Sequence, residues 1–125
     1  MARILVVDDE PSIREVLTRR LTQWGQDVVA APDARAAITA MTEQPADIVF
    51  SDVLMPELNG LWLAQQIREK WPQAVIVAVS GAQDMGIVVE MRNHGAVDYV
   101  AKPIGREMLR QALERALVTL SARID

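Results

Sequence analysis

The sequence predicts an α/β fold in which a doubly wound, five-stranded parallel sheet carries helices on both faces. Apolar runs of four to six residues alternate with segments of helical periodicity, the order that parallel strands and their connecting helices require. One run, Ala74–Val79, is apolar throughout, as in a strand that is buried on both faces. The length of 125 residues suits one domain, so we expect a single domain over residues 1–125.

Each expected element has a local signal in the sequence. The five strands are expected at residues 4–7, 28–31, 47–51, 74–79 and 97–101. Pro11 opens the first helix, because proline is favoured in a first helical turn, and Gly25 ends it. Asp33 can cap the second helix, which stops before Pro45. The third helix is expected from Gly60 to Lys70.

The third helix contains a tryptophan, Trp62, that we expect to face solvent. At about 100° per residue, Trp62 falls opposite the apolar face of the helix. That face comprises Gly60, Leu63, Ala64, Ile67 and Trp71. Exposed aromatic side chains are enriched at protein interfaces, so Trp62 marks a candidate docking surface.

The last two helices differ in the strength of their signals. The fourth, expected from Asp84 to His94, contains the run Gly86–Val89, whose poor helix propensities together cost about 2 kcal/mol relative to alanine. We therefore expect this helix to depend on tertiary contacts and to open at low free energy. The fifth helix follows Lys102-Pro103 and is amphipathic. Its expected inward residues are Met108, Leu109, Ala112, Leu113, Leu117 and Leu120.

Composition excludes several classes of protein. Thirteen basic and 17 acidic residues give a net charge of −4, and the basic residues are scattered, so we expect no direct nucleic-acid binding. The lack of cysteine excludes disulfides, thiolate zinc sites and cysteine nucleophiles. The longest uncharged run, Trp71–Gln83, has 13 residues and is too short to span a membrane. No secretory signal opens the sequence, and we expect a cytoplasmic protein.

Polar side chains follow four of the five expected strands. Asp8 and Asp9 follow the first strand, Asp52 the third, Ser80 the fourth and Lys102 the fifth. In doubly wound sheets, ligands bind at this carboxyl edge. Each residue also has a local explanation, since acids in this context cap helices and the others suit turns or loops. These explanations do not account for three carboxylates that converge on one edge and repel one another.

Charge and ligand chemistry predict a magnesium site at this edge. The carboxylates of Asp8, Asp9 and Asp52, together with the single ammonium of Lys102, sum to −2, which one divalent cation cancels. Ligation by oxygen atoms alone, with several retained waters, suits Mg²⁺. Asp52 can then attack a phosphoryl group as a carboxylate nucleophile. The oxygens of the resulting acyl phosphate can find donors in Ser80 and Lys102.

These residues lie in four segments that together resemble the receiver domain of bacterial two-component response regulators. The segments are Ile4–Glu10, Asp52–Pro56 followed by Asn59-Gly60, Ser80-Gly81, and Gly95–Pro103. The resemblance covers essentially the whole chain, because the segments occur in the order and at the spacing of the family. It implies a flavodoxin-like fold of five strands and five helices, with strand order 2-1-3-4-5.

The resemblance also implies roles for the site residues. Asp52 would be the phosphoacceptor, and Lys102 would pair with the phosphoryl oxygens. Asp9, Asp52 and the backbone carbonyl of Leu54 would bind Mg²⁺ directly. Asp8 would act mostly through a metal-bound water.

Three further residues are implied in the switch that follows phosphorylation. Ser80 would follow the phosphate, Tyr99 would change rotamer when Ser80 moves, and Pro103 would follow a cis peptide bond. The change would alter the face formed by the fourth helix, the fifth strand and the fifth helix. The implied phosphodonor is a sensor histidine kinase or a phosphotransfer protein. The output domain or partner stays open, as does a phosphorylation-dependent homodimer.

The departures from the family's pattern are mild. Ser80 replaces the commoner threonine, Asn59 stands where aspartate is frequent, and Ile104 stands where phenylalanine is often found. Leu54 and Ala82 occupy positions that tune the lifetime of the phosphate in this family. Neither side chain can position an attacking water, so the lifetime stays open.

Three other functions fit part of the pattern. One is an Mg²⁺-dependent aspartyl-phosphate phosphatase. Such enzymes resemble one another in having a second aspartate two residues after the nucleophile on the first strand, whereas here Glu10 stands two residues after Asp8. A flavodoxin-like nucleotide binder needs a phosphate loop after the first strand, and the acids there repel phosphate. A phosphorylation-independent docking module does not require the intact acidic site. Residues 1–125 leave open whether the receiver stands alone or belongs to a longer chain.

Overall fold

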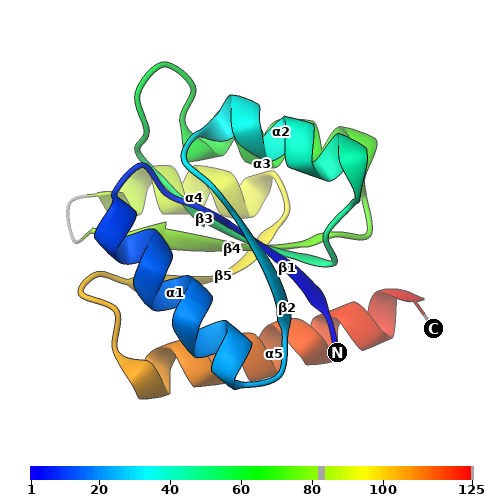
Figure 1. Cartoon of the computed structure of the whole chain (residues 1–125). Helices are drawn as coiled ribbons and strands as arrows, with labels where there is room; N and C mark the ends of the chain where they lie inside the picture. Colours follow the sequence, from blue (N-terminus) through cyan, green and yellow to red (C-terminus); the bar gives the residue numbers. More distant parts are fainter. Residues whose placement is uncertain (82–83, 125) are drawn as a thin grey trace.

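The computed structural model describes residues 1–81 and 84–124 and shows a five-stranded parallel sheet with helices on both faces (Figure 1). The strands are β1 (Arg3–Val7), β2 (Asp27–Ala31), β3 (Ile48–Asp52), β4 (Val75–Ser80) and β5 (Ala96–Ala101). The helices are α1 (Pro11–Gln23), α2 (Ala34–Glu43), α3 (Gly60–Lys70), α4 (Met85–Asn93) and α5 (Arg106–Ile124). The strand order is β2-β1-β3-β4-β5, so the predicted fold class and topology are confirmed.

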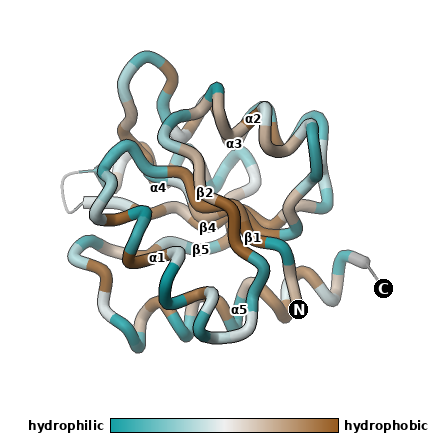
Figure 2. The backbone as a smooth tube through the Cα atoms, viewed as in Figure 1, coloured by the Kyte–Doolittle hydropathy of each residue, from teal (hydrophilic) through white to brown (hydrophobic). Residues whose placement is uncertain are grey.

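The helices form two layers, one on each face of the sheet. Helices α2, α3 and α4 cover one buried apolar cluster, and α1 and α5 cover the other (Figure 1). Figure 2 shows the most hydrophobic stretches of backbone along the strands at the centre of the molecule. A parallel sheet covered on both faces needs apolar side chains on both sides. Strands β3 and β4 meet this need, since every residue in them is buried and all are apolar except Ser51, Asp52 and Ser80 at their carboxyl ends.

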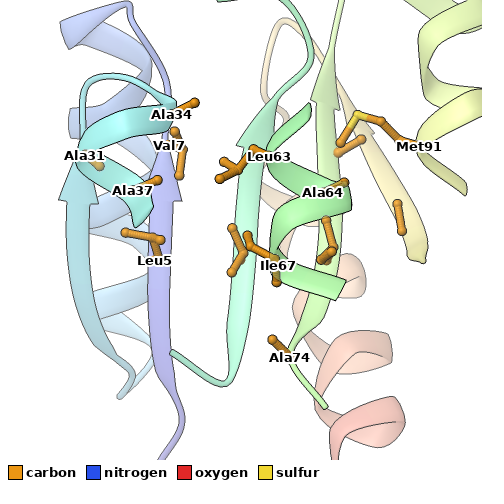
Figure 3. Packing of buried hydrophobic residues seen from close by; sticks show 14 of the residues in the cluster. Leu5, Val7, Ala31, Ala34, Ala37, Leu63, Ala64, Ile67, Ala74 and Met91 are labelled. Carbon is orange, nitrogen blue, oxygen red and sulfur yellow. The ribbon is translucent and has the colours of Figure 1, made fainter. Parts of the chain in front are cut away.

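Side chains of α2, α3 and α4 pack together on one face of the sheet. Figure 3 shows Leu63 and Ile67 of α3 lying over the sheet, with Val7 of β1 on one side and Met91 of α4 on the other. All four side chains are fully buried. On the opposite face, Phe50 of β3 is the largest fully buried side chain. The helices are therefore held in place mainly by apolar burial, which stabilises by roughly 25 cal/mol per Å².

Parallel pairing brings the carboxyl ends of the strands to one edge of the sheet. Asp52 of β3 pairs with Val79 of β4, and Ser80 of β4 pairs with Ala101 of β5. Strand β1 pairs with β3 in the same direction up to Val7, the last residue of β1. The residues that end these strands, or directly follow them, are therefore neighbours in space.

Side-chain caps are present at the starts of α2 and α3. Asp33 Oδ1 accepts a hydrogen bond from the backbone N–H of Ala36 at 2.8 Å, so the predicted cap of α2 is confirmed. Asn59 caps α3 in the same way, through Trp62 N at 3.0 Å. At α4, the side chain of Asp84 makes no capping hydrogen bond within the described residues. Across the described ranges, no helix combines the length and hydropathy that a membrane span needs.

Two side-chain predictions were wrong. Trp62 is partly buried and packs against the cluster under α2, α3 and α4. A long, flat indole can lie back along its helix over the rim of a core, so Trp62 does not mark an exposed docking surface. Met108 is 45% exposed rather than inward. At about 100° per residue it lies roughly a quarter turn from the centre of the buried stripe of α5. That stripe is Leu109, Ala112, Leu113 and Ala116.

Candidate functional site

Lys102 is the centre of a cluster of charged side chains at the carboxyl edge of the sheet. Its Nζ lies 3.4 Å from Asp8 Oδ2 and 3.3 Å from Asp52 Oδ1. The three residues are separated by up to 94 positions in sequence, and they meet because β1, β3 and β5 end at the same edge. The structure therefore brings together three of the residues that the sequence analysis placed there.

Glu10 is a member of the cluster that the sequence analysis did not assign to the site. Its Oε1 lies 3.3 Å from Lys102 Nζ. Glu10 stands at the N-cap position of α1, yet its side chain makes no capping hydrogen bond within the described part of the chain. Asp8 Oδ1 instead accepts from the Glu10 backbone N–H at 2.9 Å, which fixes the turn into the helix. Asp8 and Glu10 thus face Lys102, and the side chain of Glu10 does not cap the helix.

Burial leaves the cluster with more negative charge than Lys102 can balance. Asp8 is fully buried and Asp52 is 3% exposed. Burial, and then the charge of Asp8, raises the pKa of Asp52 to about 7, although Lys102 acts in the opposite direction. Burial also raises the pKa of Asp8. For Lys102, burial lowers the pKa, but the charges of Asp52 and Asp8 outweigh this effect and raise it.

The donor atoms of the site suit a hard divalent cation. Asp8, Asp9 and Glu10 each offer a carboxylate oxygen, and these oxygens lie within 4.8 Å of one another. Asp52 lies close enough to Asp9 for this neighbour to contribute to the raised pKa of Asp52. Among the described residues, the buried Oδ2 of Asp8 has no hydrogen-bond partner and is balanced only by its ion pair with Lys102 at 3.4 Å. An excess of carboxylate oxygens over positive charge fits Mg²⁺, which prefers oxygen ligands.

Ser80 ends β4 beside the cluster and has an unused hydroxyl. Its side chain is 1% exposed, and its Oγ has no hydrogen-bond partner in the described ranges. Its carbonyl oxygen accepts from the backbone N–H of Lys102 at 2.8 Å, which ties the end of β4 to the residue after β5. A buried hydroxyl without a partner costs free energy, and this one keeps its capacity to donate a hydrogen bond beside the cluster.

Gly60, the first residue of α3, packs directly against the backbone of Asp52. Its position at a helix start does not indicate this contact. A Cβ at Gly60 would collide with the backbone carbonyl oxygen of Asp52. The Gly60 backbone N–H donates to the carbonyl of Val53 at 2.8 Å, which holds the start of α3 against the end of β3. The sequence contains no signal for this close approach, because it depends on how α3 crosses the strand end.

The remaining expected residues lie around this cluster. Leu54 follows β3 by two residues, and its side chain is 48% exposed. Tyr99 of β5 is 42% exposed and lines a cavity of about 170 Å³ with residues of α4. The Lys102–Pro103 peptide bond is cis. Ala82 lies outside the described residues.

Comparison with known proteins places this arrangement in a family. The sequence matches the family described as "Response regulator receiver domain" over residues 4–114. It is 32% identical over 114 residues to the DNA-binding transcriptional regulator NtrC of Proteus hauseri, covering 91% of this chain and 24% of NtrC. It is 33% identical over 117 residues to the transcriptional regulatory protein KdpE of Mycobacterium tuberculosis, covering 94% of this chain and 51% of KdpE.

The structure agrees with the sequence match. It superposes on the crystal structure of the receiver domain of NtrX from Brucella abortus with a TM-score of 0.89, at 34% identity and with 93% of this chain and 98% of that chain covered. This chain spans about a quarter to a half of the curated relatives named above, so the likeness concerns one portion of each. The acidic cluster with its lysine, the strand order and the match over residues 4–114 all agree, and the chain belongs to the family of response regulator receiver domains.

Proposed function

We propose that residues 1–125 form one receiver domain that accepts a phosphoryl group on Asp52 from a sensor histidine kinase or a phosphotransfer protein in the cytoplasm. The observation that carries the proposal is the ion pairing of Lys102 with buried Asp8 and Asp52 at 3.4 and 3.3 Å, next to the unpartnered hydroxyl of Ser80. The site thus contains a nucleophile, a fixed positive charge and a spare donor. These are the groups that phosphoryl transfer to a carboxylate requires.

We infer that the acidic side chains hold Mg²⁺ during the reaction. Asp8, Asp9 and Asp52 would supply carboxylate oxygens and Leu54 its backbone carbonyl. When bound, the ion would offset the negative charge of the site and of the phosphoryl oxygens. The crowding of three carboxylates around the single Lys102 ammonium and the raised pKa of Asp52 support this inference, because both indicate that the carboxylates lack a sufficient positive partner.

Asp52 acts as the nucleophile, and its surroundings prepare it for this role. The carboxylate is largely shielded from bulk water, and the Lys102 ammonium lies 3.3 Å from one of its oxygens, where it can also attract the phosphoryl oxygens. Phosphorylation changes the charge on this side chain from about −1 to as much as about −2. Lys102 then moves its ammonium from Asp52 to the phosphoryl oxygens, and Ser80 supplies the second donor.

The output surface is the face formed by α4, β5 and α5. Tyr99, Met85 and Val89 all have exposed apolar surface on this face. The cavity between α4 and β5 gives these side chains room to repack when Ser80 moves toward the phosphate. As a phosphoacceptor the protein signals through this face and turns over no external substrate.

Mass spectrometry of the intact protein tests the proposal. The parent, incubated with acetyl phosphate and Mg²⁺, should gain one phosphoryl group, and the gain should disappear with EDTA. Asp52→Asn should gain none. Asp98→Asn is the matched control. Asp98 of β5 pairs with Arg115 of α5 at 2.6 Å, so this variant loses one carboxylate outside the site and should still be phosphorylated. Equal phosphorylation of the parent and Asp52→Asn would refute the assignment, and no phosphorylation of either would favour a docking module.

A further inference from the structure

The proposed phosphoryl transfer assigns no role to Glu10, although its carboxylate is exposed to solvent and lies beside Lys102. The side chain of Glu10 is 57% exposed, whereas those of Asp8 and Asp52 are 0% and 4% exposed. A phosphodonor approaching from solvent therefore meets the exposed carboxylate of Glu10, together with that of Asp9, before it reaches the buried Asp52.

The position of this charge is fixed by the rest of the site. Lys102 Nζ lies 3.3 Å from Glu10 Oε1, and the Glu10 carboxylate has an oxygen within 4.8 Å of those of Asp8 and Asp9. The backbone of Glu10 is held as well, because its carbonyl accepts from the N–H groups of Ile13 and Arg14 at 3.1 Å. The ion pair with Lys102 thus places the exposed carboxylate of Glu10 beside the buried acids of the site.

We propose that Glu10 is a specificity-determining residue that slows phosphorylation of Asp52 by small anionic phosphodonors. The inference rests on the proposed function of the site. Glu10 repels an incoming anion, and it also engages the Lys102 ammonium that would otherwise attract the donor. Both effects slow the reaction of Asp52 with an anionic donor. A protein donor can offset them with contacts of its own across the surface, whereas a small molecule cannot.

The reaction itself is unchanged by this role, since Glu10 does not touch the reacting atoms. With acetyl phosphate, an Asp52 carboxylate oxygen forms a bond to phosphorus while the bond from phosphorus to the acetate oxygen breaks. The electron pair of that bond leaves with acetate, and no proton or redox partner is needed. With phosphoramidate, the phosphorus–nitrogen bond breaks and ammonia leaves with the electron pair.

The size of the effect follows from the charge of the donor. At roughly 7 Å in water, one pair of unit charges changes an encounter by about threefold. Neutralising Glu10 should therefore speed the reaction of acetyl phosphate, a dianion, by roughly sevenfold, and that of phosphoramidate, which has a single net negative charge, by roughly threefold. Both gains should shrink at high salt, because the Debye length falls from about 10 Å at 0.1 M to about 3 Å at 1 M.

The test measures the rate of phosphorylation by intact mass at saturating Mg²⁺ for both donors, at low and high salt. Glu10→Gln removes the charge, and Glu10→Asp keeps it. Glu69→Gln, an exposed substitution near the far end of α3, controls for the change in net charge. We expect Glu10→Gln to be faster, more so with acetyl phosphate, mainly through a lower KM. Glu10→Asp and Glu69→Gln should keep the parental preference between donors.

The outcomes separate this inference from the function on which it rests. If the parent gains no phosphoryl group from either donor, the proposed function fails. If the parent reacts and Glu10→Gln shows equal gains for both donors, no gain, or a gain that salt does not reduce, the role of Glu10 is wrong. If Glu10→Asp behaves like Glu10→Gln, the side chain acts through its shape rather than its charge, which also overturns the inference.

Discussion

Replacing Asp52 with asparagine removes a carboxylate that the metal-free protein holds at a cost in free energy. The residue is 3% exposed, and burial together with the charge of Asp8 raises its pKa to about 7. At pH 8 the group is therefore ionised in surroundings that favour its neutral form. Asparagine keeps the shape and removes the charge, so we expect Asp52→Asn to stabilise the metal-free protein at this pH.

The raised pKa sets the magnitude of the gain. The rise from 3.8 to about 7 is a little over 3 units, and each unit corresponds to about 1.36 kcal/mol, which gives an upper limit of about 4 kcal/mol. Asparagine reproduces the protonated carboxyl imperfectly, and a mismatched hydrogen bond costs roughly 1–2 kcal/mol. We therefore expect the free energy of unfolding to rise by roughly 2–3 kcal/mol.

The same pKa fixes the direction of the pH dependence. Because the folded pKa of Asp52 lies above the unfolded value, the folded protein binds the proton more tightly, and this group favours folding at low pH. That contribution is lost as the pH rises from about 4 to about 7, the interval between 3.8 and the folded pKa. At pH 5 the cost of ionising Asp52 in the parent is only a little over a third of its value at pH 8, and the roughly 1–2 kcal/mol lost to the mismatched asparagine offsets it. The advantage of Asp52→Asn over the parent should therefore be complete at pH 8 and close to zero at pH 5.

Urea denaturation in EDTA at pH 5 and pH 8, followed by circular dichroism, measures this difference. Asp98→Asn controls for the loss of one acidic charge, and it should not stabilise the protein because it breaks the Asp98–Arg115 pair. Added Mg²⁺ should stabilise the parent more than Asp52→Asn. The reasoning is refuted if Asp52→Asn is no more stable than the parent at pH 8, or if its gain is the same at both pH values.

Three further substitutions test the packing around the site and the fourth helix. Gly60→Ala should destabilise by roughly 1–3 kcal/mol and slow phosphorylation of Asp52, because the new methyl group would displace the Asp52 carbonyl; melting curves and phosphorylation rates check this. Gly86→Ala should stabilise α4 by about 1 kcal/mol, since a Cβ there meets nothing within 4 Å, and amide exchange should show α4 opening more readily than α1 in the parent and less readily in the variant. Equal protection of α1 and α4 in the parent would contradict this. Phe50→Ala should cost roughly 3–5 kcal/mol in urea titrations, because the ring is fully buried, and a loss below 1 kcal/mol would mean that the site collapses around the gap.

The topology could be predicted from the sequence because apolar strands alternate with helical segments along the chain. The location of the site could be predicted because its polar residues directly follow the strands. Once the runs ending at Val7, Asp52 and Ser80 are parallel strands of one sheet, their exits must share an edge. The Asp33 cap was predictable for a similar reason, since it depends on residues three positions apart in the chain.

Side-chain directions depend on tertiary packing, and the sequence did not indicate them. A helical wheel describes where Trp62 leaves its helix, but the ring then lies back over the core. Glu10 fits a helix cap by its position in the sequence. Its carboxylate instead pairs with Lys102, which is distant in the chain, so only the folded structure shows that Glu10 faces the site. The close contact of Gly60 with Asp52 likewise depends on the angle at which α3 leaves the sheet.

The identity of Asp52 as the phosphoacceptor is tested most directly by reductive trapping. Protein treated with acetyl phosphate and Mg²⁺ is reduced with borohydride, which converts an aspartyl phosphate into homoserine, and peptide mass spectrometry locates the changed residue. We predict homoserine at position 52, only in the presence of Mg²⁺, and none at Asp8 or Asp9. Homoserine at another acidic position, or an unchanged Asp52 in protein that has gained a phosphoryl group, would contradict the account.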